Sequence, residues 1–332
     1  MALRQWRLFC DVNPHTFFPR CYMFSEQNEK QAFIDDFSMT AACGILKWVL
    51  RSNGKSLQND VIPRRKKKKK ARTVPEDIIV TALVVCQLHL YYSTHEDGDD
   101  LICSGIINWE QFIDDYYQVM HHGAHIQNSD KYVDYCHQLL CKLRRVNPQL
   151  DIDGEKNIWI LKPRALSRGR ESYHIVGCAI HVCNNSIQRK LKNAPNRHPN
   201  LPEENMWHSD EFKEYLCTIG KEQVWDSIII PGMKKALIQT MKATQENVIY
   251  KKNSFDIFGA DFMFGENFLP WLLEINLKPD IEKDTSVMEK LVPPMVEDIV
   301  RVVIDYKDDP NCDLGGFELI YKQVSASHGT EL

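Results

Sequence analysis

Three side chains that suit a hard cation lie near one another in an apolar stretch of this sequence, residues 254–279. Asp261 stands in the segment GADFMFG, and Glu274 and Asn276 stand in the segment PWLLEIN. Both segments are short and apolar, as strands are, and side chains of a strand point the same way at every second residue. Glu274 and Asn276 are therefore expected to share one face.

The turn between these segments decides whether the third side chain joins them. The residues GEN at 265–267 are typical of a turn. A hairpin centred between residues 267 and 268 puts Asp261 directly across from Glu274, and three oxygen ligands on one patch would suit Mg²⁺ carrying nucleotide phosphates. A polar hairpin face can also simply meet solvent. The apolar strand favours a metal, because an unpaired carboxylate is costly to bury beside it.

A second group of residues could hold the phosphates themselves. The apolar segment NIWILKP, residues 157–163, predicts a strand that ends at Lys162, and a basic loop follows it. Lysine and arginine side chains beside a glycine can bind phosphate oxygens, although most basic loops are solvated surface. The candidate nucleotide contacts are Lys162, Ser167, Arg168, Gly169 and Arg170.

The composition limits where the chain acts and what it binds. It has 332 residues and a net charge of −4, which gives no overall case for nucleic acid. Its 11 cysteines include no C-x-x-C pair, so we expect free thiols in a reducing compartment, the cytoplasm. The N-terminus lacks the apolar run of a signal peptide, and no stretch approaches the about 20 apolar residues of a membrane span.

Hydrophobic periodicity divides the chain into a helical first part and a mixed second part. We expect residues 1–150 to be mainly helical and residues 151–306 to form an α/β (α+β) region. Arg20 could contact an anion, but a solvated arginine at the surface is the simpler expectation. Residues 307–332 are expected to form a flexible tail. The expected helices cover residues 26–50, 73–92, 108–122, 131–145, 209–220, 231–248 and 284–306, the last broken near Pro293 and buried through Val296, Ile299, Val300 and Val303.

A strongly basic linker interrupts the helical part at residues 51–72. Its run RRKKKKKAR, residues 64–72, should stay extended because like charges repel one another. The run could be a nuclear address, an electrostatic hook for an acidic partner, or a solvated loop.

The motifs, taken in their order along the chain, resemble the tubulin tyrosine ligase-like family of ATP-grasp ligases. That order is a strand ending in Lys-Pro, then SRGR, then GADFMFG, then PWLLEIN. The segments FFPRCYMF, AFIDDF, NIWILKP, MWHSDEF and RVVID look similar to the glycylase branch, whose members attach glycine to glutamate side chains of tubulin tails. The likeness extends from residue 17 to residue 305 and implies an ATP-grasp-like fold.

The resemblance also implies a ligase that uses ATP and Mg²⁺. ATP would phosphorylate a glutamate γ-carboxylate, and the amine of glycine would attack the acyl phosphate to form an isopeptide bond. The implied partners are glycine and the acidic C-terminal tails of tubulin or other glutamate-rich proteins, in the cytoskeleton, cilium or axoneme. Lys162, Arg168 and Gly169 match the family's phosphate contacts. The residues that match its Mg²⁺ ligands are Asp261, Glu274 and Asn276.

The chain departs from the family pattern after Arg170. There the family continues with a long central segment that carries an adenine-binding strand and the arginine that meets the substrate, whereas Glu171 follows here at once. We therefore expect an incomplete ATP-grasp fold with little or no activity, and we assign no catalytic residue. Loss of these strands would also expose a strand edge and apolar surface.

Two other functions stay open. The chain could be a non-catalytic tubulin-binding protein that uses its basic run, or a ligase of polyglutamylase type that adds glutamate rather than glycine. Neither a membrane nor a nucleic acid is expected as a partner.

Overall fold

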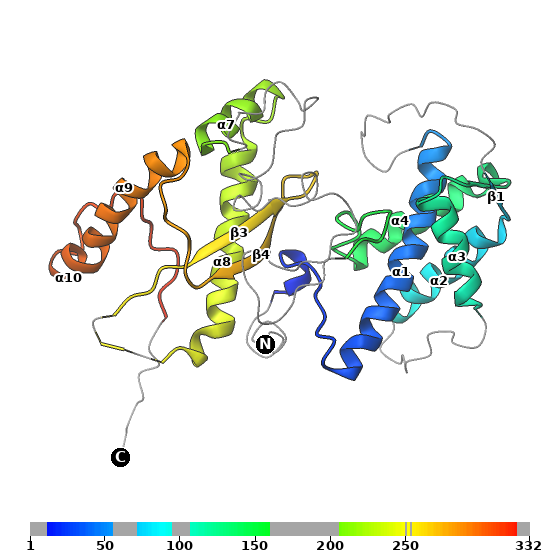
Figure 1. Ribbon diagram of the computed structural model, residues 1–332, viewed down its shortest axis with the longest axis horizontal. Coiled ribbons are helices and arrows are strands. Elements are labelled where there is room, and N and C mark those ends of the chain that lie inside the picture. Colours follow the sequence, from blue (N-terminus) through cyan, green and yellow to red (C-terminus); the bar gives the residue numbers. More distant parts are fainter. Residues whose placement is uncertain are drawn as a thin grey trace, which may run out of the picture. The chain divides into compact units, whose positions relative to one another are not determined.

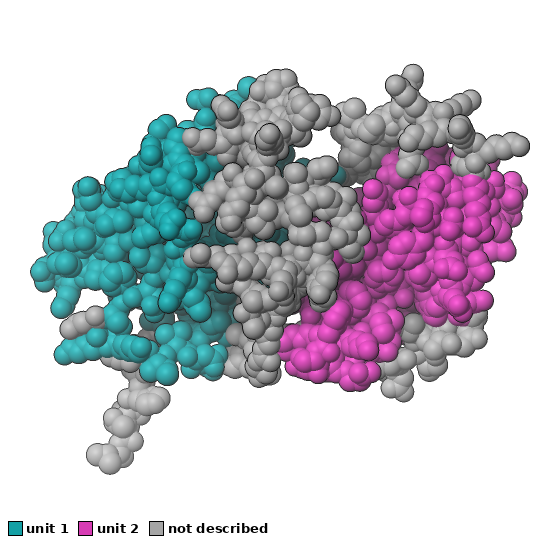
Figure 2. Space-filling view, viewed as in Figure 1, with its two compact units in different colours: residues 1–19, 160–332 teal, residues 20–159 magenta. Residues whose placement is uncertain are grey.

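The computed structural model describes residues 12–55, 72–94, 107–159, 206–249, 251–252 and 254–323. The chain forms two compact units (Figure 2). Residues 20–159 form one, which we call the helical unit, and residues 1–19 join residues 160–332 in the other, which we call the hairpin unit. The expected boundary at residue 150 lies within the helical unit, because Leu150 is fully buried in the core of that unit.

Four α-helices dominate the described part of the helical unit, as the apolar periodicity predicts (Figure 1). The helix expected from Thr73 begins only at Asp77, because Thr73–Val74 (β1) is extended and pairs in parallel with His125–Ile126 (β2). The helices are α1 (Gln27–Ser52), α2 (Asp77–Thr94), α3 (Trp109–Met120) and α4 (Val133–Val146), the last preceded by the 3-10 turn Ser129–Tyr132.

These helices pack around one apolar core. Leu46 of α1, Ile79 of α2 and Leu140 of α4 are completely buried in it. Tyr116 of α3 is also buried, and its hydroxyl donates to the backbone oxygen of Glu155 at 2.6 Å. The core therefore extends to the segment that follows α4.

Helix α2 is the one described helix that is long and apolar enough, by length and composition, to cross a membrane. This differs from the expectation that no stretch comes close to a span. Its side chains Ile78, Ile79, Ala82 and Cys86 are buried in the core of the helical unit. A core helix passes the same test of length and composition, so the finding by itself does not make α2 a membrane span.

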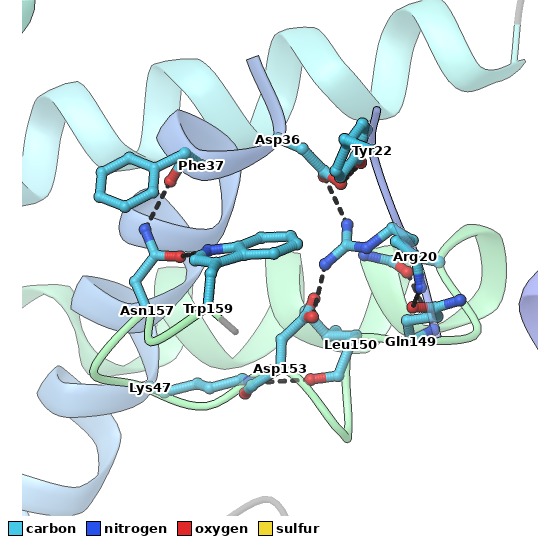
Figure 3. Close-up of polar contacts among 11 residues, drawn as sticks. Arg20, Tyr22, Asp36, Phe37, Lys47, Gln149, Leu150, Asp153, Asn157 and Trp159 are labelled. Atoms are coloured by element: carbon cyan, nitrogen blue, oxygen red, sulfur yellow. Dashed lines mark hydrogen bonds and ion pairs between the residues drawn. The ribbon is translucent and has the colours of Figure 1, made fainter. Parts of the chain in front are cut away.

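Arg20 lies in a buried polar cluster and not at the solvated surface expected from the sequence (Figure 3). Its guanidinium forms ion pairs with Asp36 of α1 and with Asp153, and it lies over the ring of Trp159 at 5.9 Å. The side chains of Arg20, Asp36 and Asp153 are only 13%, 16% and 12% exposed. The hydroxyl of Tyr22 donates a further hydrogen bond to Asp36.

Burial and the neighbouring charges shift the pKa values of this cluster in opposite directions. Burial alone would lower the pKa of Arg20, but the carboxylates of Asp153 and Asp36 raise it above its ordinary value. Burial raises the pKa of Asp153, although the charges of Arg20 and Lys47 lower it. The ammonium group of Lys47 donates to two backbone oxygens, that of Leu150 at 2.6 Å and that of Asp153 at 2.8 Å. The cluster thereby joins the first residue of the helical unit to α1 and to the segment after α4.

The described part of the hairpin unit combines helices with one two-stranded sheet. The strands β3 (Gly259–Phe264) and β4 (Pro270–Asn276) are antiparallel, and they lie across α8 (Ile230–Thr244) in Figure 1. The other elements are the 3-10 turns Pro14–Thr16 and Gln245–Asn247, the helices α7 (Ser209–Thr218), α9 (Ser286–Val300) and α10 (Tyr306–Asp308), and the π-helical turns Trp225–Ile229 and Arg301–Asp305.

Helix α9 differs from its expected form in two ways. It continues through Pro293 and Pro294 without a break. The face expected to be buried is largely exposed, with Val296 at 46% and Val300 at 48%, because the unit packs instead against other positions. Those buried positions are Val287, Val292 and Asp298.

The segment after α10 was expected to be a flexible tail, yet its described part makes specific contacts. The backbone N–H of Gly316 donates to the carboxylate of Asp298 at 2.8 Å. Glu318 pairs with Lys234 of α8, and the hydroxyl of Tyr321 donates to a side chain that follows α8. These bonds hold residues 316–321 against the helices of the hairpin unit.

Candidate metal-binding hairpin

The turn of the hairpin forms where the sequence predicts it. The N–H of Gly265 donates to the backbone oxygen of Leu269 at 3.0 Å. The N–H of Phe268 donates to the backbone oxygen of Gly265 at 2.8 Å. Phe268 takes the left-handed backbone conformation, with φ of 62°. The side-chain oxygen of Asn267 accepts from the N–H of Leu269 at 3.2 Å, which supports the tight reversal.

Asp261 lies directly across from Glu274, as expected, but the register that produces this pairing contains an irregularity. Next to it, Phe262 pairs with Leu272. Leu273 therefore has no partner residue of its own and forms a β-bulge, one extra residue on β4.

The bulge decides which face of the sheet carries the candidate ligands. Leu272 points into the core against α8, so strict alternation would turn Glu274 and Asn276 inward as well. The extra residue, Leu273, shifts the alternation by one and turns both side chains to the face of Asp261. The expected centre of the hairpin, between residues 267 and 268, is half a residue late, because Phe264 pairs with Pro270 and the turn is centred on residue 267. The extra residue on β4 compensates for this difference, so Asp261 still lies across from Glu274. In the sequence the bulge is marked by the two successive leucines before Glu274, which interrupt the alternation of apolar and polar side chains along β4.

The three candidate metal ligands come together on the outer face of the hairpin. The side-chain nitrogen of Asn276 donates to the carboxylate of Asp261 at 3.3 Å. Asp261 and Glu274 are exposed, and Asn276 is half-buried. The expected cost of burying these carboxylates is therefore absent, because the outer face of the apolar hairpin leaves them in reach of water.

The inner face of the hairpin fixes its position in the unit. Leu272 packs in a small core with Phe17 and Ala236, and its N–H donates to the backbone oxygen of Phe17 at 2.8 Å. Gly232 of α8 lies so close to Pro270 that a Cβ atom there would stand 2.6 Å from the proline ring. The outer face is thus presented by strands that α8 and residue 17 hold in place.

These donors fit a hard divalent cation. Carboxylate and amide oxygens are the ligands that Mg²⁺ takes in proteins, and such a site is completed by water and substrate phosphates. In the described residues no three or more His, Cys, Asp and Glu side chains gather as a metal site would. The chain would therefore supply two carboxylates and one amide here.

The candidate nucleotide contacts Lys162, Ser167, Arg168, Gly169 and Arg170 lie outside the described residues. Their predicted role is neither supported nor opposed by the structure.

The described residues thus form a mixed α/β protein whose hairpin presents ligands for a hard cation. Comparison with known proteins gives its family. Residues 172–312 match the tubulin-tyrosine ligase family. The chain is 35% identical to a tubulin monoglycylase of Mus musculus, over 97% of this chain and 44% of that protein. It is 34% identical to a tubulin monoglycylase of Homo sapiens, over 97% of this chain and 53% of the relative.

A protein monoglycylase of Mus musculus is 35% identical over 97% of this chain and 50% of that relative. The chain therefore belongs to the tubulin-tyrosine ligase family, in its glycylase branch, as its motifs suggested. It spans about half the length of the curated relatives it matches.

The alignments are longer than the chain itself. The alignment with the mouse tubulin monoglycylase covers 411 positions. This chain has only 332 residues, and 97% of its own residues lie in that alignment. The relative therefore has positions within the aligned region that have no counterpart here.

Proposed function

We propose that this chain is a shortened ATP- and Mg²⁺-dependent ligase of the glycylase type, with little or no activity of its own. The chemistry in question forms an isopeptide bond between glycine and a glutamate side chain of tubulin. The names of the relatives support the reaction and the substrate, since they are tubulin and protein monoglycylases.

The bulged hairpin is the observation that carries this proposal. Asp261, Glu274 and Asn276 would hold the cation, and a cation there would neutralise phosphate charge. The protein's own part is positioning: the bulge at Leu273 aims the ligands outward, and α8 fixes the strands that carry them. Lys162 and the SRGR residues 167–170 would hold the nucleotide phosphates, as the family resemblance implies.

The expected lack of activity rests on the segment that is absent after Arg170. The length of the alignment with the mouse relative supports such a loss, because that relative has extra positions within the aligned region. An ATP-grasp site encloses the nucleotide between two lobes, so a chain without the adenine-binding strand and the substrate arginine should bind and turn over poorly. The fold would then be an incomplete ATP-grasp fold, a finer statement than the mixed α/β architecture described above.

Incorporation of labelled glycine tests this proposal. The purified chain is incubated with tubulin, ATP, Mg²⁺ and labelled glycine, beside the mouse monoglycylase as a positive control. We expect incorporation close to background. Robust labelling of tubulin would contradict the proposed inactivity, and labelling with glutamate in place of glycine would show that the chain is of the polyglutamylase type.

A non-catalytic role in binding tubulin is the second candidate function. The run RRKKKKKAR at residues 64–72 is strongly basic and would complement acidic tubulin tails. Cosedimentation with microtubules should fall steeply as salt rises, and replacing the five lysines at 66–70 with glutamine should abolish it. Binding that ignores both changes would exclude this electrostatic account. On either account we propose a location in the cytoskeleton, cilium or axoneme.

A further inference from the structure

The outer edge of β3 carries backbone groups that no other strand in the described residues uses. Along an antiparallel strand, every second residue turns its N–H and C=O toward the neighbour and the others turn theirs away. Gly265 bonds to Leu269 across the hairpin, and Leu272, the partner of Phe262, turns its N–H away from β3 to reach Phe17. By this alternation the groups of Ala260, Phe262 and Phe264 point away from β4.

The two edges of the sheet differ in how they are protected. On β4, Pro270 has no N–H and Leu272 is bonded to Phe17, so that edge is closed at both positions. On β3, no backbone hydrogen bond joins Ala260, Phe262 or Phe264 to any partner beyond the hairpin in the described residues. The strand sequence GADFMF also lacks the lysines and prolines that natural edges use against further pairing.

We propose that two copies of this chain pair through the outer edges of β3, antiparallel and about a two-fold axis at Phe262. In this register Phe262 faces the partner's Phe262, and Ala260 faces the partner's Phe264. The three residues would each donate to and accept from the second copy, which joins the two hairpins into one continuous sheet.

Side-chain size and charge favour this register over its neighbours. It sets the small Ala260 opposite the large Phe264, which suits close pairing on the core side of the sheet. It sets Asp261 opposite the partner's Met263, whereas an axis one residue earlier would oppose the two copies of Asp261 and repel. Met263 is 52% exposed in the single chain, so the pairing also covers an apolar side chain that now meets water.

The pairing is isologous and closes on itself. Each copy offers the same edge, and a dimer uses both edges, so no open edge of β3 is left for a third copy. The proposal does not depend on ligase activity or on a bound cation.

Sedimentation equilibrium of the full chain, with charge variants at Met263, tests the proposal. Met263→Asp sets like charges opposite each other twice in the dimer, and we expect the dimer dissociation constant to rise roughly tenfold or more. Met263→Lys sets opposite charges there, so dimerisation should be kept or strengthened. Met241→Asp is a matched control, because Met241 is 46% exposed on α8, away from the edge, and the change should leave the dimer intact.

Hydrogen exchange gives a second readout of the same edge. Peptides that cover residues 259–264 should exchange more slowly as the protein concentration rises, and Met263→Asp should remove this effect. A chain that stays monomeric at every concentration would overturn the proposal. So would equal effects of the aspartate and lysine variants, assemblies larger than a dimer, or a dimer in which these amides keep their monomer exchange rate.

Discussion

Replacing Arg20 with methionine should destabilise the helical unit far more than replacing any surface arginine. Arg20 is 13% exposed and bonds to two carboxylates, those of Asp36 and Asp153, which are themselves 16% and 12% exposed. Methionine keeps an apolar stem beside Trp159 but removes the charge. Two acids would then be left in the protein interior without their cation.

The size of the effect follows from this burial. Breaking a buried ion pair by removing one partner costs about 3–5 kcal/mol, because the other charge stays desolvated. The contact of Arg20 with the ring of Trp159 adds about 0.5–1 kcal/mol. Some of the loss is offset, because Tyr22 still donates to Asp36 and the charge of Lys47 still acts on Asp153. We expect a loss of about 3 kcal/mol in the free energy of unfolding.

Urea unfolding, followed by circular dichroism and by hydrogen exchange in residues 20–159, measures this loss. Arg144→Met is the matched control, since Arg144 makes a bidentate pair with Asp151 but both side chains are about one-third exposed. That change should cost about 1 kcal/mol or less. A loss below about 1 kcal/mol for Arg20→Met, or equal losses for the two variants, would show that the Arg20 cluster does not stabilise the helical unit as a buried ion pair.

Three further predictions concern single residues. Burial raises the pKa of the Tyr116 hydroxyl, so the contribution of this side chain to stability is complete below about pH 10 and is lost as the pH rises further. The difference in unfolding free energy between the wild type and Tyr116→Phe, measured by urea unfolding, should therefore shrink above that pH. Gly232→Ala should destabilise the hairpin unit by about 1–3 kcal/mol in thermal unfolding, because the new Cβ overlaps a proline of β4, whereas Gly154→Ala meets nothing within 4 Å and should be neutral. Burial raises the pKa of Cys136 to about 12, so iodoacetamide at pH 8 should label the exposed Cys21 and spare Cys136, as mass spectrometry of the native protein can show.

The features that depend on local periodicity could be predicted from the sequence. The helices of the helical unit follow from apolar residues at helical spacing, and the hairpin follows from two apolar segments around a turn. Asp261 and Glu274 were expected to face each other, and they do. The family could be recognised from the order of its motifs, and the comparisons confirm it.

The features that depend on distant partners could not be predicted. Arg20 looks like a surface arginine because nothing near it in the sequence announces Asp153, which comes from the other end of the helical unit. A one-residue bulge at Leu273 leaves the composition of β4 unchanged, so it becomes visible only in the register. The apolar stripe through Val296 and Val300 shows that α9 has an apolar face, but such a pattern does not tell whether a neighbour covers it.

Cation binding at the hairpin can be measured in solution. Mn²⁺ is titrated into the full chain under electron paramagnetic resonance, with Mg²⁺ as competitor, for the wild type, Glu274→Gln and Glu266→Gln. Glu266 is an exposed glutamate in the turn of the same hairpin, so it controls for the loss of one charge. We expect Glu274→Gln to weaken Mn²⁺ binding roughly tenfold or more and Glu266→Gln to change it little. Equal binding by all three proteins, or no binding by the wild type, would contradict the assignment of Asp261, Glu274 and Asn276 as metal ligands.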